Sequence, residues 1–410
     1  MASTSTIWNK DYEWKAITLL SLGFGLVGLD RWIIAPLLPS MIKDLKFNYQ
    51  DVGYIFGALG LVWGIFAIFA GGLSDKLGHR KILIPSILLF SLMSGFSGMA
   101  GGLTSLILIR ALMGATEGAF CPTSFAATAV AAKPSRMGFL QGLQQSGFAL
   151  FGLALGPIIA TQLLLVVPSW REVFWVVAIP GIIIGILMFF VIKDPVPIAS
   201  TSNLGDNQVS QRTNWSAILK SKNIVICMLA LFCSMACIFV LSAMIPLYLE
   251  NYLKIDAQQM GFVTSALGFG GFIGQFALPG ISDKFGRKIV AIVGFIGATI
   301  SVWIFSSIGA NPTALFMSLF VTAFFCLGNI ALITGPIATE SAPIGLVASA
   351  IGLVVGAGEI FGGGVAPLIG GYIAEHFGIQ NVLYLALFGV ALGAVVSLFL
   401  KETAPVIVEK

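Results

Sequence analysis

Five charged residues interrupt long apolar stretches of the sequence. Asp30 and Arg31 are adjacent, Arg110 and Glu117 are seven residues apart, and Glu359 stands in a glycine-rich stretch. A guanidinium group is always charged and can bind a carboxylate through two parallel hydrogen bonds, which suits an anionic ligand. A carboxyl group at membrane depth can take up or release a proton when its pairing with a guanidinium changes. Together the five residues predict a site for an organic anion that also exchanges protons.

These residues lie in stretches that are apolar enough to cross a membrane. The chain has 410 residues, of which 57% are hydrophobic and 10% charged, with a mean hydropathy of +0.97. Soluble domains average roughly 25% charged residues, and about 20 apolar residues in a helix span the bilayer core. Twelve such stretches fall at approximately 16–38, 51–73, 82–100, 104–128, 138–166, 172–192, 223–247, 258–280, 289–309, 313–336, 346–372 and 380–400. The sequence therefore predicts an all-α polytopic membrane protein with twelve transmembrane helices.

The composition excludes several other classes of protein. The 5 cysteines all lie within apolar stretches, which excludes a secreted disulfide scaffold. The net charge of +4 arises from 22 basic and 18 acidic residues, a balance that excludes a nucleic-acid-binding protein. The sequence contains no metal, nucleotide or phosphate motif. We therefore expect no enzyme activity and no cofactor, with an ion gradient as the energy source.

Basic residues between the helices predict which side of the membrane each loop occupies. With the N-terminus placed in the cytoplasm, sixteen of the 22 Lys and Arg residues lie inside and four lie in outer loops. The N-terminal segment lacks the features of a cleaved signal peptide. Both termini are therefore expected in the cytoplasm. Residues 1–192 and 223–410 are predicted to form two six-helix bundles, joined by a polar cytoplasmic linker at 193–222.

A repeated loop relates the two bundles. The segment GGLSDKLGHRK begins at Gly71 after the second predicted helix, and PGISDKFGRK begins at Pro279 after the eighth. Their aspartates, Asp75 and Asp283, are 208 residues apart, and prolines in the fifth and eleventh helices are 210 residues apart. Two parallel repeats with a binding site at their interface are typical of a transporter.

The repeated loops are candidates for a conformational switch. The residues that we assign to it are Gly71, Asp75, Gly78, Arg80, Asp283 and Arg287. The glycines allow close packing of helices, and the aspartates can pair with basic side chains or with the N-terminus of a facing helix. We expect such contacts to hold the two halves together in one conformation and to break in the other. The alternative is that the loops only anchor the chain at the anionic inner leaflet.

The repeated loop resembles the G-x-L-[AS]-D-[RK]-x-G-[RK]-[RK] hallmark of the major facilitator superfamily, and the resemblance covers nearly the whole chain. It implies two six-helix pseudo-repeats that work by alternating access. The Asp30-Arg31 pair and the segment RALMGATEG, which begins at Arg110, further resemble the anion:cation symporters. That family includes bacterial sugar-acid symporters, sialin and vesicular glutamate transporters. The resemblance implies that Arg31 and Arg110 bind or gate the anion and that Asp30 and Glu117 couple protons.

Helix geometry brings the charged residues to similar depths. Arg31 and Arg110 are predicted roughly 10 Å and 9 Å below the outer surface, and Glu117 shares the face of Arg110, roughly 10 Å deeper. Other readings remain open: Arg110 could bond only to carbonyl groups of the first helix, and Asp30 could only neutralise Arg31. Glu359 either faces the site from the second half, where it would couple protons, or caps a helix break.

The leading functional hypothesis is proton-coupled import of a small organic anion, such as a sugar acid or an aromatic acid. Asn329 is the best placed uncharged residue for substrate binding. The short first outer loop, 39–50, favours a bacterial protein in the inner membrane, acting as a monomer whose partners are the anion, protons and lipid, without nucleic acid. Proton-driven efflux of drugs or metabolites is an alternative, since Gly152, Gly156 and Pro157 partly match an antiporter pattern. A Spinster-like lysolipid carrier is a second, and a receptor with this fold is a third.

Overall fold

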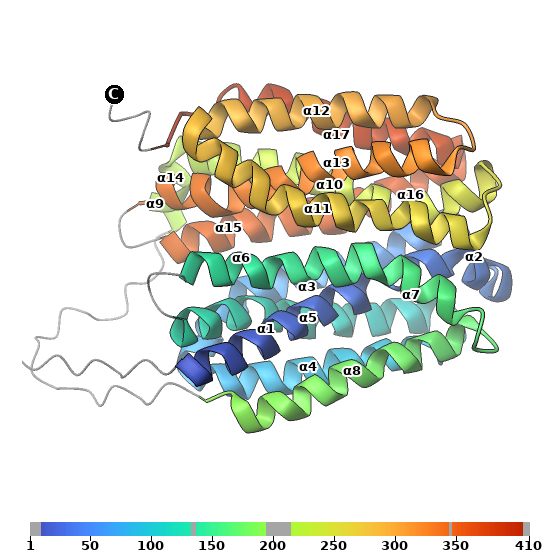
Figure 1. Ribbon diagram of the computed structural model, residues 1–410, viewed down its shortest axis with the longest axis horizontal. Coiled ribbons are helices and arrows are strands. Elements are labelled where there is room, and N and C mark those ends of the chain that lie inside the picture. The colour runs from blue at the N-terminus through green and yellow to red at the C-terminus, as the bar shows by residue number, and fades with distance from the viewer. Residues whose placement is uncertain (1–9, 133–136, 194–214, 344–346, 405–410) are drawn as a thin grey trace, which may run out of the picture.

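The protein is a bundle of long helices in which the two halves of the chain pack side by side. The computed structural model describes residues 10–132, 137–193, 215–343 and 347–404, and within these ranges it contains no β-strand. Twelve helical spans are long and apolar enough to cross a membrane, which confirms the sequence prediction. In Figure 1 the helices of the second half lie above those of the first, and the described chain begins and ends at the same end of the bundle. We call this end the termini end.

The helices of the first half begin at Lys10 and end at Val191. They are α1 (Lys10–Trp32), α2 (Ile34–Leu45), α3 (Tyr49–Leu77), α4 (His79–Ser97), α5 (Leu103–Ala131), α6 (Met137–Phe148), α7 (Gly156–Leu163) and α8 (Trp170–Val191). The first span runs from Lys10 to Leu45 and is therefore longer than the predicted 16–38. It breaks between α1 and α2 at Ile33, directly beside Asp30 and Arg31.

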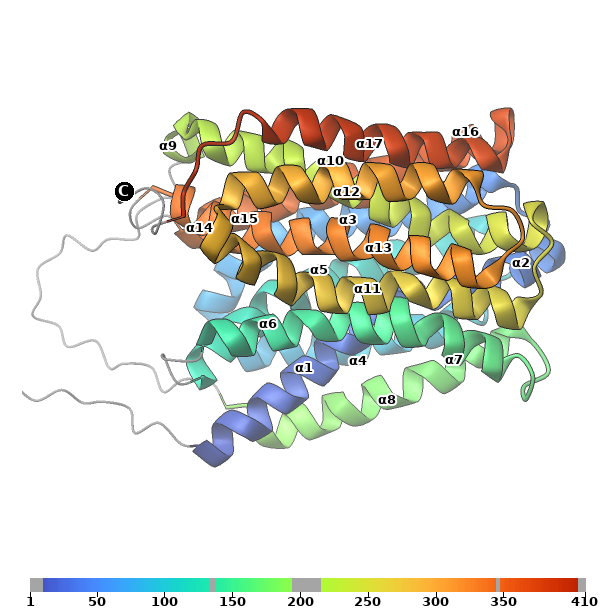
Figure 2. The ribbon, with the colours of Figure 1, turned by 45° about the horizontal axis from the view of Figure 1, so that its top comes forward.

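The second half follows a short helix within the predicted linker. That helix is α9 (Trp215–Lys220). The others are α10 (Lys222–Leu247), α11 (Ala257–Phe285), α12 (Arg287–Ser307), α13 (Pro312–Leu332), α14 (Ala338–Ser341), α15 (Val347–Gly358), α16 (Ala366–Phe377) and α17 (Val382–Ser397). In Figures 1 and 2 α11 runs along α6 and α7 of the first half.

Wider, π-helical turns interrupt three of the described spans and end a fourth. Two of them occupy equivalent places in the two halves: η2 (Ala149–Leu155) joins α6 to α7, and η5 (Glu359–Val365) joins α15 to α16. Both have seven residues, and they are offset by 210 residues, the offset of Pro157 and Pro367. Proline lacks an N–H and clashes with the carbonyl group one turn earlier, which favours a wider turn before it. The sequence repeat therefore extends to a local distortion of the backbone.

Glycines bring the two halves into close contact along two equivalent seams. A Cβ atom at Gly53 of α3 would lie 2.7 Å from the carbonyl oxygen of Pro367, and one at Gly261 of α11 would lie 2.9 Å from that of Pro157. Gly53 and Gly261 are 208 residues apart. Each seam thus joins the helix before a repeated loop to a π-interrupted span of the other half. Close backbone approach through small residues is the usual way in which membrane helices associate.

Candidate functional site

The five charged residues singled out from the sequence meet in the middle of the bundle. They come from α1 (Asp30 and Arg31), α5 (Arg110 and Glu117) and η5 (Glu359), and none is more than 3% exposed. The Glu117 carboxyl group lies within electrostatic range of the other four charged groups. We call these five residues the central cluster. Buried charges are costly in a membrane protein unless they are paired or have a function.

Arg31 pairs with the second half of the molecule. Its Nη2 atom donates to Oε1 of Glu359, which is 328 residues away in the sequence, and the two side chains are 4% and 3% exposed. This contact answers the question that the sequence left open for Glu359, since its carboxylate faces the cluster. Because α1 and η5 belong to different halves, the ion pair ties the halves together at the depth of the cluster.

Aromatic rings surround the Arg31 guanidinium. Its central carbon lies 4.7 Å from the ring centroid of Phe239, 5.6 Å from that of Trp32 and 5.9 Å from that of Trp63. Cations are attracted to the faces of such rings at these distances. We call Trp32, Trp63 and Phe239 the aromatic cage. The rings supply an apolar boundary that keeps water from the ion pair.

Arg110 bonds to the backbone of α1 and has further N–H donors that are unpaired in the described chain. Its Nη1 atom donates to the carbonyl oxygens of Asp30 and Arg31, at 3.3 Å and 3.2 Å. Arg110 therefore makes the bonds to carbonyl groups of the first helix that the structural alternative predicts. Its Nε and Nη2 atoms are buried and have no hydrogen-bond partner in the described chain, so Arg110 can also bind a ligand.

Several other polar atoms around the cluster are buried without a hydrogen-bond partner among the described residues. They are both carboxyl oxygens of Asp30 and of Glu117, and the indole N–H groups of Trp32 and Trp63. Ser94 lies beside the carboxyl group of Asp30. Leaving a buried donor or acceptor unpaired costs about 1–3 kcal/mol, and each such group in a folded protein needs an explanation. Here the unpaired donors and acceptors lie close to one another, as expected of a site that binds a ligand and protons.

Asn329 does not join the central cluster. It is fully buried in α13, where its Nδ2 atom donates to the carbonyl oxygen of Ala291 in α12 at 3.3 Å. A Cβ atom at Gly294 would lie 2.8 Å from Asn329 Nδ2, so the amide fills the space above a glycine of α12. In this structure Asn329 thus joins two helices of the second half, the commoner use of such a side chain in membranes, while its Oδ1 atom has no partner among the described residues; its expected role in substrate binding stays a prediction.

The repeated loops have the same backbone conformation in both halves. Gly78 and Gly286 have φ angles of 94° and 97°, and each donates its N–H to a serine carbonyl oxygen four residues earlier, Ser74 or Ser282, at 2.9 Å. Only glycine adopts such angles without strain. Gly78 is therefore required by the turn itself. The structure does not describe the surroundings of Gly71 or the side chains of Asp75 and Lys76, so these predicted switch residues lie outside the described part.

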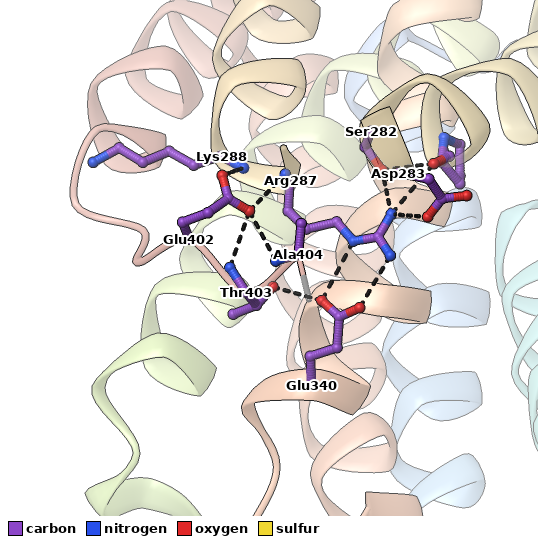
Figure 3. A network of polar contacts seen from close by, with 9 residues as sticks. Ser282, Asp283, Arg287, Lys288, Glu340, Glu402, Thr403 and Ala404 are labelled. Carbon is purple, nitrogen blue, oxygen red and sulfur yellow. Dashed lines mark hydrogen bonds and ion pairs between the residues drawn. The ribbon is translucent and has the colours of Figure 1, made fainter. Parts of the chain in front are cut away.

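Arg287 is the centre of a polar network at the termini end (Figure 3). Its Nη1 donates to Asp283 and to Ser282, both at 2.6 Å, while Nε and Nη2 donate to the two carboxylate oxygens of Glu340 at 3.3 Å and 3.0 Å. Glu402 accepts from the backbone N–H groups of Arg287 and Lys288 at the start of α12, at 2.8 Å and 3.2 Å. We call this set the Arg287 network.

The partners that the structure gives for the loop residues do not cross between the halves. Those of Arg287 and Asp283 all belong to the second half. Arg80 donates to the carbonyl oxygen of Phe189 at 2.6 Å, within the first half. In this conformation the guanidinium of Arg287 is committed to the loop from which it comes and to Glu340, so the expectation that the loops join the halves in one conformation and not in the other stays a prediction.

The described polar contacts between the halves lie instead at the cluster and at the end opposite the termini. There Lys43 pairs with Glu250 at 3.1 Å, and the N–H of Tyr49 donates to Glu375 at 2.9 Å. The hydroxyl group of Tyr49 accepts from the side chain of Asn251 at 3.2 Å. The described polar contacts between the halves thus run from the middle of the bundle to the end that lies farthest from the termini.

The aromatic cage was missed by reasoning from the sequence. Large aromatic residues are common in membrane helices, and 32 phenylalanines and 8 tryptophans offer no reason to select three. One signal was available: Phe239 follows Arg31 by 208 residues, the offset of the repeated loops. It therefore occupies the place in the second half that Arg31 occupies in the first, and the repeat predicts that the two face each other.

Comparisons with known proteins agree with this arrangement. The family model described as Major Facilitator Superfamily matches residues 20–252 and 227–410. A hexuronate transporter of Bacillus subtilis is 26% identical over 67% of this chain and 68% of its own length, and the multidrug resistance protein MdtG of Proteus mirabilis is 26% identical over 92% and 93%.

A solved structure shares the fold. It is a bacterial homologue of the human lysosomal transporter Spinster, crystallised in an inward-facing, unoccupied conformation, and it superposes with a TM-score of 0.79 at 14% identity, covering 95% of this chain and 97% of its own. The family match covers almost the whole chain, and the twelve spans in two equivalent halves have the matching architecture. The chain therefore belongs to the major facilitator superfamily, a superfamily of membrane transporters and not of enzymes.

Proposed function

We propose that this protein imports a small organic anion together with protons, by alternating access between its two halves. The observation that carries the proposal is the buried ion pair between Arg31 and Glu359, which joins the halves at the central cluster. The Glu359 carboxylate binds the Arg31 guanidinium, which would otherwise bind the carboxylate of a substrate. Arg31 can thus exchange one carboxylate for another, and the exchange changes a contact between the halves.

The charges of the cluster explain why protons must accompany the anion. Two guanidinium groups face three carboxyl groups, so the fully ionised cluster carries one net negative charge. A further anion would add to this charge in a buried site, which is costly at membrane depth. Protons on the carboxyl groups remove the excess. Anion and protons therefore bind together more favourably than either binds alone, which is the thermodynamic basis of symport.

The order of events follows from the contacts. A proton on Glu359 breaks its charge pairing with Arg31, and the substrate carboxylate then binds Arg31 in its place. The free donors of Arg110 stabilise the same anion. The carboxyl groups of Asp30 and Glu117 bind the other protons that accompany it. Because Glu359 lies in a π-helical turn between two glycine-packed segments, its release lets η5 move relative to α1 and opens the other side of the bundle.

Sequence relatives and charge distribution support the same function and its setting. Hexuronates, the substrates named for one relative, are carboxylates. The bias of basic residues toward the loops at the termini end supports an orientation with both termini in the cytoplasm, in the inner membrane of a bacterium. The proton gradient supplies the energy without a cofactor, and a monomer contains both halves of the site. A cysteine introduced at position 206 and labelled from outside intact cells would contradict this orientation.

Proton-driven efflux is the competing function, since MdtG is named for multidrug resistance and matches over most of its length. The sign of proton movement separates the two. Proteoliposomes with a trapped pH dye and equal pH on both sides receive benzoate, glucuronate or sulfoacetate from outside. Symport carries protons inward with the anion and acidifies the lumen, whereas antiport alkalinises it. Protein-free liposomes control for passive entry of the neutral acid, and alkalinisation by every transported acid would refute the proposal.

A further inference from the structure

The walls around Arg31 show what kind of anion body the site accepts. The three rings of the aromatic cage are at most 8% exposed. Trp32 lies 5.3 Å from Phe239 and stacks on Phe56 of α3, with centroids 5.6 Å apart and an interplanar angle of 28°. A group attached to a carboxylate on Arg31 therefore meets flat, apolar surfaces.

The second half adds little polarity to this wall. On α10, Met235 and Ser242 lie one turn on either side of Phe239 and share its face. Gly362 of η5 packs against Met235, so the neighbouring span contributes backbone and methylene groups there. The hydroxyl group of Ser242 is buried without a partner. It is the one polar side-chain group that this face of α10 offers in the described chain between Met235 and Ser242.

Two of the buried amides of the bundle, those of Gln144 and Asn329, already bond to neighbouring helices, although Asn329 Oδ1 has no partner among the described residues. Gln144 accepts from Thr128 at 2.6 Å and donates to Ser124 at 2.8 Å, and Asn329 donates to a carbonyl group of α12. A polyhydroxylated substrate needs partners for each of its hydroxyl groups, because unpaired hydroxyl groups lose their hydration without compensation. Proteins that recognise sugars provide such partners from side chains around the ring. The described residues around Arg31 provide mainly aromatic faces, and the unpaired hydroxyl groups of Ser242 and of Ser94, which lies beside Asp30, are few for a polyhydroxylated ring.

The unpaired donors near Arg31 fit a carboxylate. Nε and Nη2 of Arg110 and the indole N–H groups of Trp32 and Trp63 can donate but cannot accept. A carboxylate only accepts, whereas a hydroxyl group needs both a donor and an acceptor. The unpaired acceptors, on Asp30 and Glu117, are those to which the proposed function assigns protons. The site therefore has donors for one carboxylate and apolar rings for what the carboxylate is attached to.

We infer that the substrate is a monocarboxylate with a flat and largely apolar body, of the benzoate class, and not a polyhydroxylated sugar acid. Its carboxylate replaces Glu359 on Arg31, and its ring contacts Trp63 and Phe239. This inference rests on the proposed function but narrows it, since a sugar-acid symporter would satisfy the proposal and fail the inference. Trp63 and Phe239 thereby become residues that determine specificity.

Three six-membered-ring carboxylates test the inference. Benzoate, cyclohexanecarboxylate and glucuronate carry one carboxylate each and differ in the polarity and flatness of the ring. Calorimetric titration of the purified full-length protein at mildly acidic pH compares their affinities. We expect benzoate to bind at least about tenfold more tightly than glucuronate, because unpaired hydroxyl groups cost free energy in an apolar site. Cyclohexanecarboxylate should lie between them.

Two variants connect the preference to the cage. Phe239→Leu keeps an apolar side chain but removes the ring, and it should weaken benzoate about fivefold while changing cyclohexanecarboxylate less. Trp63→Phe keeps a ring but removes the N–H, and it should weaken both acids by a similar factor of about three. Trp303→Phe, at a side chain that is 62% exposed on α12, is the matched control and should bind all three acids as the wild type does. Thermal unfolding curves of each variant show whether it is folded.

Each outcome decides between the two claims. Tighter binding of glucuronate than of benzoate, with the affinity lost in Arg31→Lys, would overturn the inference and leave the proposed function standing. Absence of Arg31-dependent binding for all three acids would count against the proposed function itself. An unchanged ratio of benzoate to cyclohexanecarboxylate affinity in a folded Phe239→Leu protein would show that the ring does not contact the substrate.

Discussion

The central cluster and the Arg287 network both combine buried arginine side chains with carboxylates, but they differ in how completely these groups are paired. In the Arg287 network the Nε, Nη1 and Nη2 atoms of Arg287 all donate to oxygen atoms, and Glu402 accepts from four backbone N–H groups. In the central cluster the carboxyl oxygens of Asp30 and Glu117 have no hydrogen-bond partner in the described part of the chain, and Arg110 uses one of its three nitrogens for oxygen acceptors. The same residue types thus stabilise the fold where their polar atoms are paired, and we propose that they bind a ligand where these atoms are unpaired.

The two regions also differ in what they connect. The Arg287 network joins a loop, α12 and the segment after α17, which all belong to one half. The central cluster joins α1 to η5 across the interface between the halves. Alternating access moves the halves relative to each other, so only the second kind of contact has to break and reform during transport. Substitutions in the two regions should therefore affect different measurements.

The largest effect is expected for Arg31→Lys, which keeps the charge but replaces a planar fork by a point charge. We expect transport to fall by at least about tenfold, because the loss of a two-pronged contact to a carboxylate in a buried site costs more than 1.4 kcal/mol. Initial rates in proteoliposomes measure this. Arg171→Lys is the matched control, since Arg171 pairs with Asp44 at a partly exposed position. Normal affinity and rate in Arg31→Lys would mean that Arg31 has only a packing role.

Glu117→Gln should separate exchange from net uptake. The amide resembles the protonated carboxyl group and cannot release a proton, so the variant should still bind the anion and exchange it across the membrane. Accumulation driven by a pH gradient should fall to the level of protein-free liposomes if Glu117 carries a coupled proton. Loss of binding and exchange together would assign Glu117 to packing. Full pH-driven accumulation would leave coupling to Asp30 or Glu359.

In the Arg287 network, Glu340→Gln should change stability and leave anion affinity as it is. The substitution removes the charged partner that accepts from two nitrogens of Arg287, whose side chain is 8% exposed. Asp283 still pairs with Arg287 at 2.6 Å, so we expect a loss of about 1 kcal/mol and a decrease in Tm of a few degrees. Thermal unfolding in detergent provides the measurement. A loss of anion binding as large as that of Arg31→Lys would erase the distinction between the two regions.

The smallest effect is expected for Glu402→Gln, and it depends on pH. Partial burial acts to raise the pKa of Glu402, but hydrogen bonds from the backbone N–H groups of Ala404, Arg287, Thr403 and Lys288 outweigh it and hold that pKa below its ordinary value. The stabilisation by the carboxylate is therefore complete above the pKa of the unfolded chain and disappears as the pH falls through the lower pKa of the folded protein.

At neutral pH, Glu402→Gln should lower the Tm by about 1–2 °C, as for the loss of a helix cap. The difference from the wild type should shrink in acid, because both proteins then lack the negative charge at the start of α12. Unfolding curves at neutral and acidic pH test this. A difference that grows in acid would contradict the assignment of the ionised form to the cap.

The sequence was sufficient to predict the membrane spans and to select the charged residues of the central cluster. Twelve apolar stretches have no folded alternative to crossing a bilayer, and helical rise alone brings Arg31 and Arg110 to one depth. The bonds from Arg110 to the carbonyl groups of Asp30 and Arg31 confirm that match.

The direction in which a side chain points from its helix was harder to predict than its depth in the membrane. Asn329 lies well inside its helix, but packing against Gly294 turns it toward α12. The pair of Arg31 with Glu359 depends on how two helices 328 residues apart face each other. That orientation is set by the glycine seams and by the π-helical turn at η5, whose wider spacing rotates the residues that follow it. Neither feature can be read from a single helix.

The central claim is that Glu359 holds the place of the substrate on Arg31. The most direct test compares how the affinity for an anion depends on pH in the wild type and in Glu359→Gln. Titrations with benzoate and, in parallel, with glucuronate are run from mildly acidic to mildly alkaline pH. The wild type should bind its anion more tightly as the pH falls, because a proton on Glu359 frees Arg31. Glu359→Gln should bind at alkaline pH about as tightly as the wild type does in acid, with most of the pH dependence gone. An unchanged pH dependence, or a variant that binds no anion at any pH while remaining folded, would contradict the account in which Glu359 holds the place of the substrate.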